Sequence, residues 1–236
     1  MLTLVLTRHG LTDRSRPEQH LGQKIDISIN DAGRRQADAL RRRLATVKFD
    51  RVLTSPQFRA RETAEIVAGR GAQIEADPRL KEMDYGAWEG RTYAQIDEHD
   101  RAFRGEWLAH PDTLACPGGE SGDDVSVRVT SFLSELLDEH RSWVARTSFR
   151  AATATGGRAA PLNDHRVLAV AHGTFNRIFL CVALDTDIRR FRQRYIQSQC
   201  NLTVLAWADD AGPRQGTLLV SNDTSHLHGA NDLPWG

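Results

Sequence analysis

Two histidines in this sequence follow runs of apolar residues, and each is followed by glycine. The first run ends in "LTLVLTRHG", which places Arg8 and His9 before Gly10; the second, "HRVLAVAHG", places His172 before Gly173. Runs of this kind are typical of strands covered on both faces in a parallel sheet. Because ligands of open α/β sheets bind beyond the carboxyl ends of the strands, both histidines are expected at that edge.

Phosphate is a ligand that this pattern favours. Glycine allows close backbone approach, and a helix following His172 would direct its amide groups at an anion. Arg8 can bind phosphate through two parallel hydrogen bonds, and Arg59, in "SPQFRARETA", would bring a second guanidinium to the same edge. The alternatives are that polar residues merely close the strands and that the arginines are solvated. Five other histidines are interpreted as ordinary core or surface residues: His20, His99, His110, His140 and His165.

Other phosphoryl-transfer chemistries lack their signatures in this chain. No cysteine is followed six residues later by arginine, "KIDISIN" has one of the two aspartates that an aspartyl-phosphate enzyme uses, and "TGGRAAPL" lacks the GK[ST] ending of a Walker loop. There is no HExxH motif and no Cys/His cluster, so neither His9 nor His172 is interpreted as a metal ligand. A histidine nucleophile is the chemistry that remains.

Strand and helix patterns alternate along the chain, which predicts an α/β protein built from βαβ units. Residues 83–122 are predicted to form loops and short helices over the sheet, and 146–164 a surface insertion or mobile loop, within a single domain over 1–236. The expected strands are 2–6, 49–55, 165–171 and a closing pair at 201–209 and 216–223; the expected helices are 30–47, 56–71, 123–145 and 174–184.

Composition argues against nucleic-acid and membrane partners. Lys plus Arg and Asp plus Glu both number 31, which gives a formal net charge of +0. No apolar run approaches the roughly 20 residues that span a bilayer, and the apolar start lacks the basic region of a signal peptide. The three cysteines are far apart and are interpreted as reduced thiols, which suits a cytoplasmic enzyme. A homodimer is left open.

Six motifs occur in the order "LTRHGLT", "SPQFRARETA", "LKEMDYGAWEG", "PGGES", "VAHG" and "NDTSHL". Together they resemble the histidine phosphatase superfamily, also called the phosphoglycerate mutase-like family, over residues 2 to about 228. The resemblance implies a three-layer α/β/α sandwich with a mixed, mainly parallel central sheet, and neither a metal nor another cofactor. It also implies that His9 takes the phosphoryl group as phosphohistidine. Arg8, Arg59 and His172 would complete the phosphate pocket, and Glu82 would donate a proton to the leaving group.

Further polar residues match the family pattern around the phosphate. Thr12 and Gln23 stand where the family has phosphate-contacting side chains, and Gly173 is expected to allow close approach to the substrate. Ser15 occupies a position where the family often has asparagine, and its hydroxyl would have to substitute for the amide.

The proposed roles set requirements on protonation. Adjacent arginines should lower the pKa of His9 so that a neutral imidazole attacks, while a protonated His172 would help spread the charge of the phosphoryl group. Glu82 must be protonated when the alkoxide departs and ionised when it activates water. Asp84 and Glu89 are alternatives to Glu82, but acidic residues close before glycine often bind turn backbone and are interpreted as structural.

The favoured activity is that of a histidine acid phosphatase-like phosphoric monoester hydrolase acting on a small phosphorylated metabolite. The mutases of the family usually have an adjacent arginine pair after the acid, where this chain has the separated Arg101 and Arg104, and "CPGGES" resembles the phosphatase branch. Mutase-type transfer and a non-catalytic binding module are the alternatives.

The substrate stays open among sugar phosphates, phosphoglycerate derivatives and nucleotide-loop precursors such as α-ribazole phosphate. A cap-like segment at about 90–122 carries Tyr93, Phe103, Trp107 and Leu108, which would contact the substrate or form a small separate core.

Overall fold

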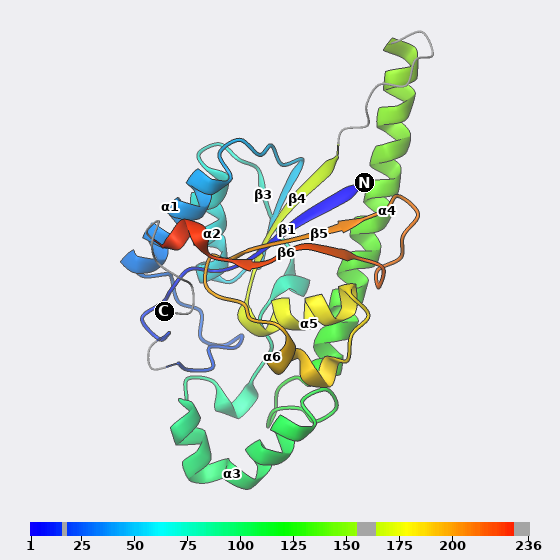
Figure 1. The fold of residues 1–236 in the computed structure, drawn as a ribbon. Coiled ribbons are helices and arrows are strands. Elements are labelled where there is room, and N and C mark those ends of the chain that lie inside the picture. Colours follow the sequence, from blue (N-terminus) through cyan, green and yellow to red (C-terminus); the bar gives the residue numbers. More distant parts are fainter. Residues whose placement is uncertain (16–17, 155–163, 229–236) are drawn as a thin grey trace.

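The computed structural model describes residues 1–15, 18–154 and 164–228 (Figure 1). Six strands form one sheet in the order β3-β2-β4-β1-β5-β6. The strands are β1 (Leu2–Arg8), β2 (Arg51–Thr54), β3 (Ile74–Ala76), β4 (His165–Ala171), β5 (Leu202–Trp207) and β6 (Thr217–Asp223). The α-helices are α1 (Asp31–Arg43), α2 (Phe58–Ala68), α3 (Tyr93–Ala109), α4 (Gly122–Ala154), α5 (Gly173–Ala183) and α6 (Phe191–Arg194).

Helices cover both faces of the sheet, which confirms the predicted three-layer architecture. β1, β2, β3 and β4 pair in parallel, whereas β5 and β6 are antiparallel to their neighbours, so the sheet is mixed and mainly parallel. α1 and α2 bury apolar side chains against one face, and α4 and α5 against the other (Figure 1). No helix in the described part of the chain is both long enough and apolar enough to cross a membrane.

The two histidine-bearing strands are immediate neighbours at the centre of the sheet. Arg8 pairs with Ala171 in the parallel register of β1 and β4, and the amide of His9 donates a hydrogen bond to the carbonyl of Ala171 at 3.0 Å. Parallel strands end at the same edge, so this register brings His9 beside His172.

The helix that follows β1 begins where its capping residue predicts. The side chain of Asn30 accepts a hydrogen bond from the amide of Gly33 at 3.0 Å, and α1 starts at Asp31. Gly33 in turn faces the loop that follows His9, because a Cβ at this position would lie 2.3 Å from the carbonyl oxygen of Leu11. Close packing of α1 therefore fixes the turn after His9.

Three segments differ from the expectations. β3 was not predicted, because three residues give too little pattern to recognise. Residues 83–122, which were expected to lie over the sheet, contain α3, a 17-residue helix that bends at Asp100 and lies away from the strands in Figure 1. α4 continues to Ala154, so the insertion expected from 146 begins as helix, since "RTSFRAATA" lacks glycine and proline. Residues 155–163 of that insertion lie outside the described residues.

Glycine-to-alanine substitutions should separate packing from helix propensity. We expect Gly33→Ala to lower the free energy of unfolding by about 1–3 kcal/mol, since the methyl group would collide with backbone. The matched change Gly105→Ala, in α3, meets nothing within 4 Å and should instead raise stability by up to about 1 kcal/mol. Chemical denaturation of both variants would measure this difference, and equal effects would contradict the packing argument.

Candidate active site

His9 and His172 lie side by side at the carboxyl edge of the sheet. Their ring centroids are 5.2 Å apart with an interplanar angle of 58°. Both side chains are buried, at 3% and 0% exposure. Nδ1 of His9 lies 2.8 Å from the carbonyl oxygen of Gly10, and because that oxygen can only accept, Nδ1 carries the proton of the neutral ring. Nε2 of His9 is then left with a free lone pair.

Two arginines surround this pair, and parts of their guanidinium groups have no protein partner. Arg59, on the first turn of α2, is fully buried and donates to the carbonyls of Gly22 and Ile25. Arg8 donates to the carbonyl of Gln197 at 3.0 Å. Nε of each arginine is buried without a hydrogen-bond acceptor in the described residues. Such donors favour an anionic ligand, since buried polar groups are nearly always hydrogen-bonded.

Glu82 is held by backbone amides at the start of α5. Its Oε1 accepts from the amides of Met83 and Phe175, both at 2.9 Å, and its Oε2 accepts from the amide of Thr174 at 3.2 Å. The neighbouring carbonyl of Glu82 accepts from Arg128 of α4. These contacts keep the carboxyl group buried in the wall of the pocket.

Gln57 and Gln23 fix the backbone around the acid. Oε1 of Gln57 accepts from the amide of Glu82 at 3.0 Å, and Nε2 of Gln57 donates to the carbonyl of Gly22 at 2.8 Å. Nε2 of Gln23 donates to the carbonyl of Glu82 at 2.9 Å. Gln57 was not identified from the sequence, because a glutamine at a helix start carries no distinctive signal.

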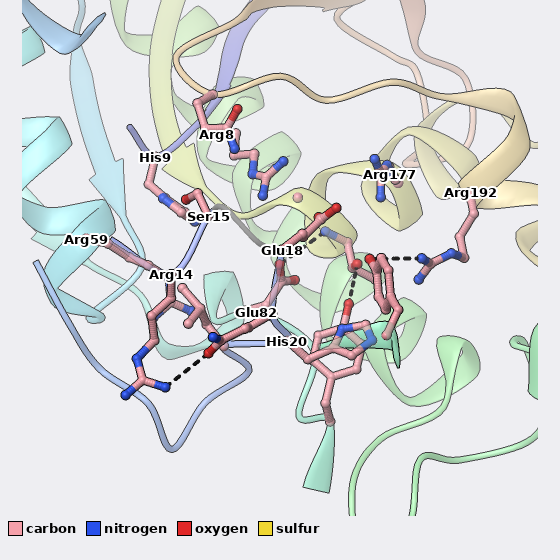
Figure 2. Close-up of a pocket in the computed structure, with 17 residues that line it drawn as sticks. Arg8, His9, Arg14, Ser15, Glu18, His20, Arg59, Glu82, Arg177 and Arg192 are labelled. Atoms are coloured by element: carbon pink, nitrogen blue, oxygen red, sulfur yellow. Dashed lines mark hydrogen bonds between the residues drawn. The ribbon is translucent and has the colours of Figure 1, made fainter. Parts of the chain in front are cut away.

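The pocket unites most of the residues named from the sequence. Its lining includes Arg8, His9, Ser15, Arg59, Glu82 and Gly173 (Figure 2). A Cβ at position 173 would lie 3.1 Å from the Arg8 guanidinium. A larger residue would therefore push the Arg8 side chain aside, and glycine lets Arg8 keep its position. His172 lies behind the lining, in contact with the His9 ring. Thr12 and Gln23 do not line the pocket, and Thr12 instead hydrogen-bonds Ser15.

The two rival carboxylates bind turn backbone, as expected from the glycines that follow them. Oδ1 of Asp84 accepts from the amide of Gly86 at 2.7 Å. The carboxylate of Glu89 accepts from the amides of Gln23 and Lys24 at 2.8 and 2.7 Å. Neither carboxylate lines the pocket, which leaves Glu82 as the buried carboxyl group in its wall.

The pocket also contains residues that the sequence analysis did not select. His20 was interpreted as an ordinary residue, yet it lines the pocket and packs against Tyr85 with ring centroids 4.0 Å apart. Among the additional basic residues, Arg14 and Arg177 closely follow the two His-Gly motifs, whereas Arg192 comes from α6. The further lining residues are Arg14, Glu18, Gln19, His20, Leu21, Tyr85, Tyr93, Thr174, Arg177, Arg192 and Gln199.

The cap aromatics divide between pocket and core. Tyr93 lines the pocket, whereas Trp107 is buried and packs edge-to-face on Trp88 with centroids 5.5 Å apart. Phe103 packs on the same tryptophan, and Leu108 is 39% exposed. Of these four residues, one therefore lines the pocket, two pack on Trp88 and one is exposed.

Burial and positive charge keep both central imidazoles neutral. Burial, with smaller contributions from Arg59 and Arg8, lowers the pKa of His9 well below its ordinary value. Burial, followed by Arg59, also lowers the pKa of His172 well below its ordinary value in the free pocket, whereas the sequence analysis expects a protonated His172 once the phosphoryl group is present. Burial lowers the pKa of Arg59 to about 10, which leaves this guanidinium charged at neutral pH.

In the described part of the chain, no group of three or more His, Cys, Asp and Glu residues is arranged to hold a metal ion.

Buried neutral histidines should make the fold sensitive to acid. Burial lowers the pKa of His20 to about 3, so below pH 6.5 the unfolded chain binds a proton that the folded chain excludes. Stability should therefore fall as pH drops from 6.5 toward 3, by up to about 1.4 kcal/mol per pH unit for this group alone. The slope of the unfolding free energy against pH reports how many protons the chain takes up on unfolding. His20→Gln should lower this number by up to about one between pH 7 and 5, as measured by denaturation. Exposed His99→Gln is the control, and the same slope in both variants would contradict a buried neutral His20.

Comparisons with known proteins agree with this geometry. The family model described as "Histidine phosphatase superfamily (branch 1)" matches residues 4–219. The chain is 34% identical over 171 residues to glucosyl-3-phosphoglycerate phosphatase of Mycobacterium tuberculosis, covering 72% of this chain and 70% of that protein. It is 32% identical over 201 residues to the zebrafish (Danio rerio) fructose-2,6-bisphosphatase TIGAR B, covering 75% and 74%. The solved structure of Bacillus stearothermophilus YhfR has a TM-score of 0.78 at 28% identity, covering 97% of this chain and 100% of that one. The chain therefore belongs to the histidine phosphatase superfamily.

Proposed function

We propose that this protein is a metal-independent phosphomonoesterase that hydrolyses a small phosphorylated metabolite through a phosphohistidine intermediate. The observation that carries the proposal is the set of buried polar groups around His9 that have no hydrogen-bond partner within the described residues: Nε of Arg8, Nε of Arg59 and the two ring nitrogens of His172, one of which is a donor in the neutral ring. A phosphoryl group bound here would accept hydrogen bonds from the N–H groups of this set and stand next to the His9 imidazole. The relatives' names, with glucosyl-3-phosphoglycerate and fructose 2,6-bisphosphate as substrates, support a small phosphorylated compound.

In the first step, Nε2 of His9 attacks phosphorus as the bond from phosphorus to the ester oxygen breaks. The hydrogen bond from Nδ1 to the carbonyl of Gly10 holds the ring in the tautomer that leaves Nε2 unprotonated. Arg8 and Arg59 stabilise the charge on the phosphoryl oxygens, and the buried site strengthens this interaction. Glu82, in its acid form, gives its proton to the departing oxygen, so the first product leaves as an alcohol.

In the second step, a water molecule takes the place of the departed alcohol and attacks the phosphorus of the phosphohistidine. Glu82, now ionised, takes a proton from water as the oxygen attacks, and the bond between phosphorus and Nε2 of His9 breaks. Phosphate is released, His9 returns to its neutral form and Glu82 to its acid form. The cycle needs no metal and no other co-reactant.

Hydrolysis is favoured over mutase-type transfer by the positions of Arg101 and Arg104. Neither lines the pocket, and Arg104 forms an ion pair with Asp97 at 2.6 Å. These arginines therefore neither form the adjacent pair that the family's mutases usually have after the acid nor reach the pocket. The acid phosphatase-like character and a cytoplasmic location belong to the same proposal; the free, buried thiols of Cys116, Cys181 and Cys200 suit a reducing compartment.

His9→Ala should reduce phosphate release by at least about 10³-fold, since it removes the attacking atom. The measurement is phosphate release from a panel of phosphorylated metabolites with chelator present, alongside conversion of 3-phosphoglycerate to 2-phosphoglycerate. His99→Ala, which removes an exposed imidazole, is the matched control. Appreciable turnover by purified His9→Ala would exclude His9 as nucleophile, and interconversion without release would make the protein a mutase.

Glu82→Gln should affect the two steps unequally when the leaving group is p-nitrophenolate. This leaving group needs little protonation, so phosphorylation of His9 should persist while water attack slows by about 10²–10⁴-fold. A burst of p-nitrophenolate followed by slow turnover is expected in stopped-flow measurements, together with acid-labile phosphoprotein. Glu18→Gln, at the exposed rim, is the control. A uniform loss of both phases in the Glu82 variant would argue against Glu82 as the group that activates water.

A further inference from the structure

The segment that carries Glu82 is joined to α4 by an arginine whose hydrogen bonds are all used. Arg128, in the second turn of α4, donates through Nη1 to the carbonyls of Arg79 and Lys81, both at 2.7 Å. Its Nη2 donates to the carbonyl of Glu82 at 3.1 Å. Nε and Nη2 also donate to the two carboxylate oxygens of Glu120, each at 3.1 Å. All five N–H groups of this guanidinium therefore have acceptors, and none is left for a substrate.

Glu120 completes the connection on the other side of the acid. Its Oε2 accepts from the amide of Asp84 at 2.8 Å and from Nε2 of Gln23 at 3.2 Å. The amide of Glu120 in turn donates to the carbonyl of Asp84 at 2.8 Å. The ion pair of Arg128 with Glu120 therefore binds the backbone both before and after Glu82. The two side chains are 16% and 22% exposed, so water has little access to these contacts.

Arg128 also packs against the helix that holds the carboxyl group of the acid. Its guanidinium lies 5.3 Å from the centroid of the Phe175 ring, at the start of α5. The amide of Phe175 donates to Oε1 of Glu82 at 2.9 Å. The backbone of Glu82 and the residue that binds its carboxyl group therefore contact the same guanidinium. Loss of Arg128 should let the carboxyl group move relative to His9.

A second arginine joins the same segment to α4 without reaching the acid. Arg79 donates to the carboxylates of Asp77 and Glu135 at 2.6 and 2.7 Å, and its guanidinium lies 5.5 Å from the centroid of the Phe132 ring. None of the hydrogen bonds described for its side chain involves Glu82 or the amides that bind it. Arg79 therefore offers a matched control, with the same charge and a similar ring contact.

We propose that Arg128, fixed by Glu120, is a positioning residue that keeps the carboxyl group of Glu82 at the ester oxygen while the proton is transferred. This inference rests on the proposed hydrolysis at His9 and extends it to side chains that lie outside the pocket lining. Proton transfer requires the acid within hydrogen-bond reach of the oxygen, and a displacement of about 1 Å can reduce a rate by about 10²-fold. Loss of Arg128 should therefore weaken protonation of the leaving group while the His9 imidazole still attacks.

The leaving group separates this effect from a general loss of structure. p-Nitrophenolate departs with little protonation, whereas phenolate is a poorer leaving group that depends on the acid. With enzyme in excess over substrate, release of either phenol reports phosphorylation of His9, whatever the speed of the later water attack. In rapid-quench measurements, Arg128→Gln should slow the reaction of phenyl phosphate by about 10-fold to 100-fold and that of p-nitrophenyl phosphate by less than about 3-fold. Glu120→Gln should change the ratio of the two rates in the same direction.

Arg128→Lys distinguishes position from charge. The charge of Arg128 reaches the pocket, because it contributes to the lowered pKa of His172, after burial, Arg59 and His9. Lysine keeps this charge but provides three N–H donors instead of five. Partial recovery of the phenyl phosphate rate is therefore expected, and full recovery would assign the effect to charge and overturn the positioning role.

Arg79→Gln is the control for stability. It should lower the thermal unfolding temperature and leave the ratio of the two rates as in the wild type. Circular dichroism would verify the fold of each variant, and if Arg128→Gln does not fold, Arg128→Lys and Glu120→Gln carry the test. A wild-type ratio in the folded Arg128 and Glu120 variants, or an equal change in Arg79→Gln, would overturn the proposal.

Failure of the proposed function would be visible separately. If wild-type hydrolysis of p-nitrophenyl phosphate does not depend on His9, the proposed function is wrong, and the positioning role falls with it. If that hydrolysis depends on His9 and the Arg128 variants keep the wild-type ratio, the positioning role alone is wrong.

Discussion

The parallel pairing of β1 with β4 is the constraint on which the site depends. Hydrogen bonds between these central strands fix a register in which Arg8 lies opposite Ala171. A histidine directly follows each of these two residues, His9 after Arg8 and His172 after Ala171. A shift of one residue would move each side chain to the other face of the sheet. The apolar residues of both strands, buried on two faces, oppose such a shift, so the same packing that stabilises the sheet sets the distance between the two imidazoles.

Burial then determines the chemistry available at this edge. Removing His9 from water disfavours its charged form, and the arginines beside it act in the same direction. The sequence analysis attributed the low pKa of His9 to the arginines alone, but burial is the larger cause. The same environment keeps His172 neutral in the free pocket. A bound phosphoryl group would add negative charge between these residues. This charge would be stabilised by the positively charged groups around it and would stabilise them in turn.

Local pattern carried the prediction of the α/β elements and of the residues at the carboxyl edge of the sheet, whereas the three-layer arrangement came from the resemblance to a known family. The buried strands, the cap at Asn30 and the helix after His172 each have a signal within a few residues, and the structure has all of them. His9 and Arg8 were found for the same reason. Arg177 and Arg192 were not, because their place in the pocket lining depends on where α5 and α6 pack against distant segments. His20 was missed because its burial arises from contact with Tyr85, which the local sequence does not reveal.

α5 connects several parts of the pocket wall to one another. At its first turn, the position of Gly173 lets the Arg8 guanidinium approach, and the amides of Thr174 and Phe175 hold the carboxyl group of Glu82. Arg177 lies four residues after Gly173, hence on the same face of the helix. Because the helix is almost wholly buried, these groups keep fixed relative positions. A displacement of α5 would therefore disturb the groups around Glu82, Arg8 and Arg177 together, whereas Arg192 and Tyr93 reach the same pocket from α6 and α3.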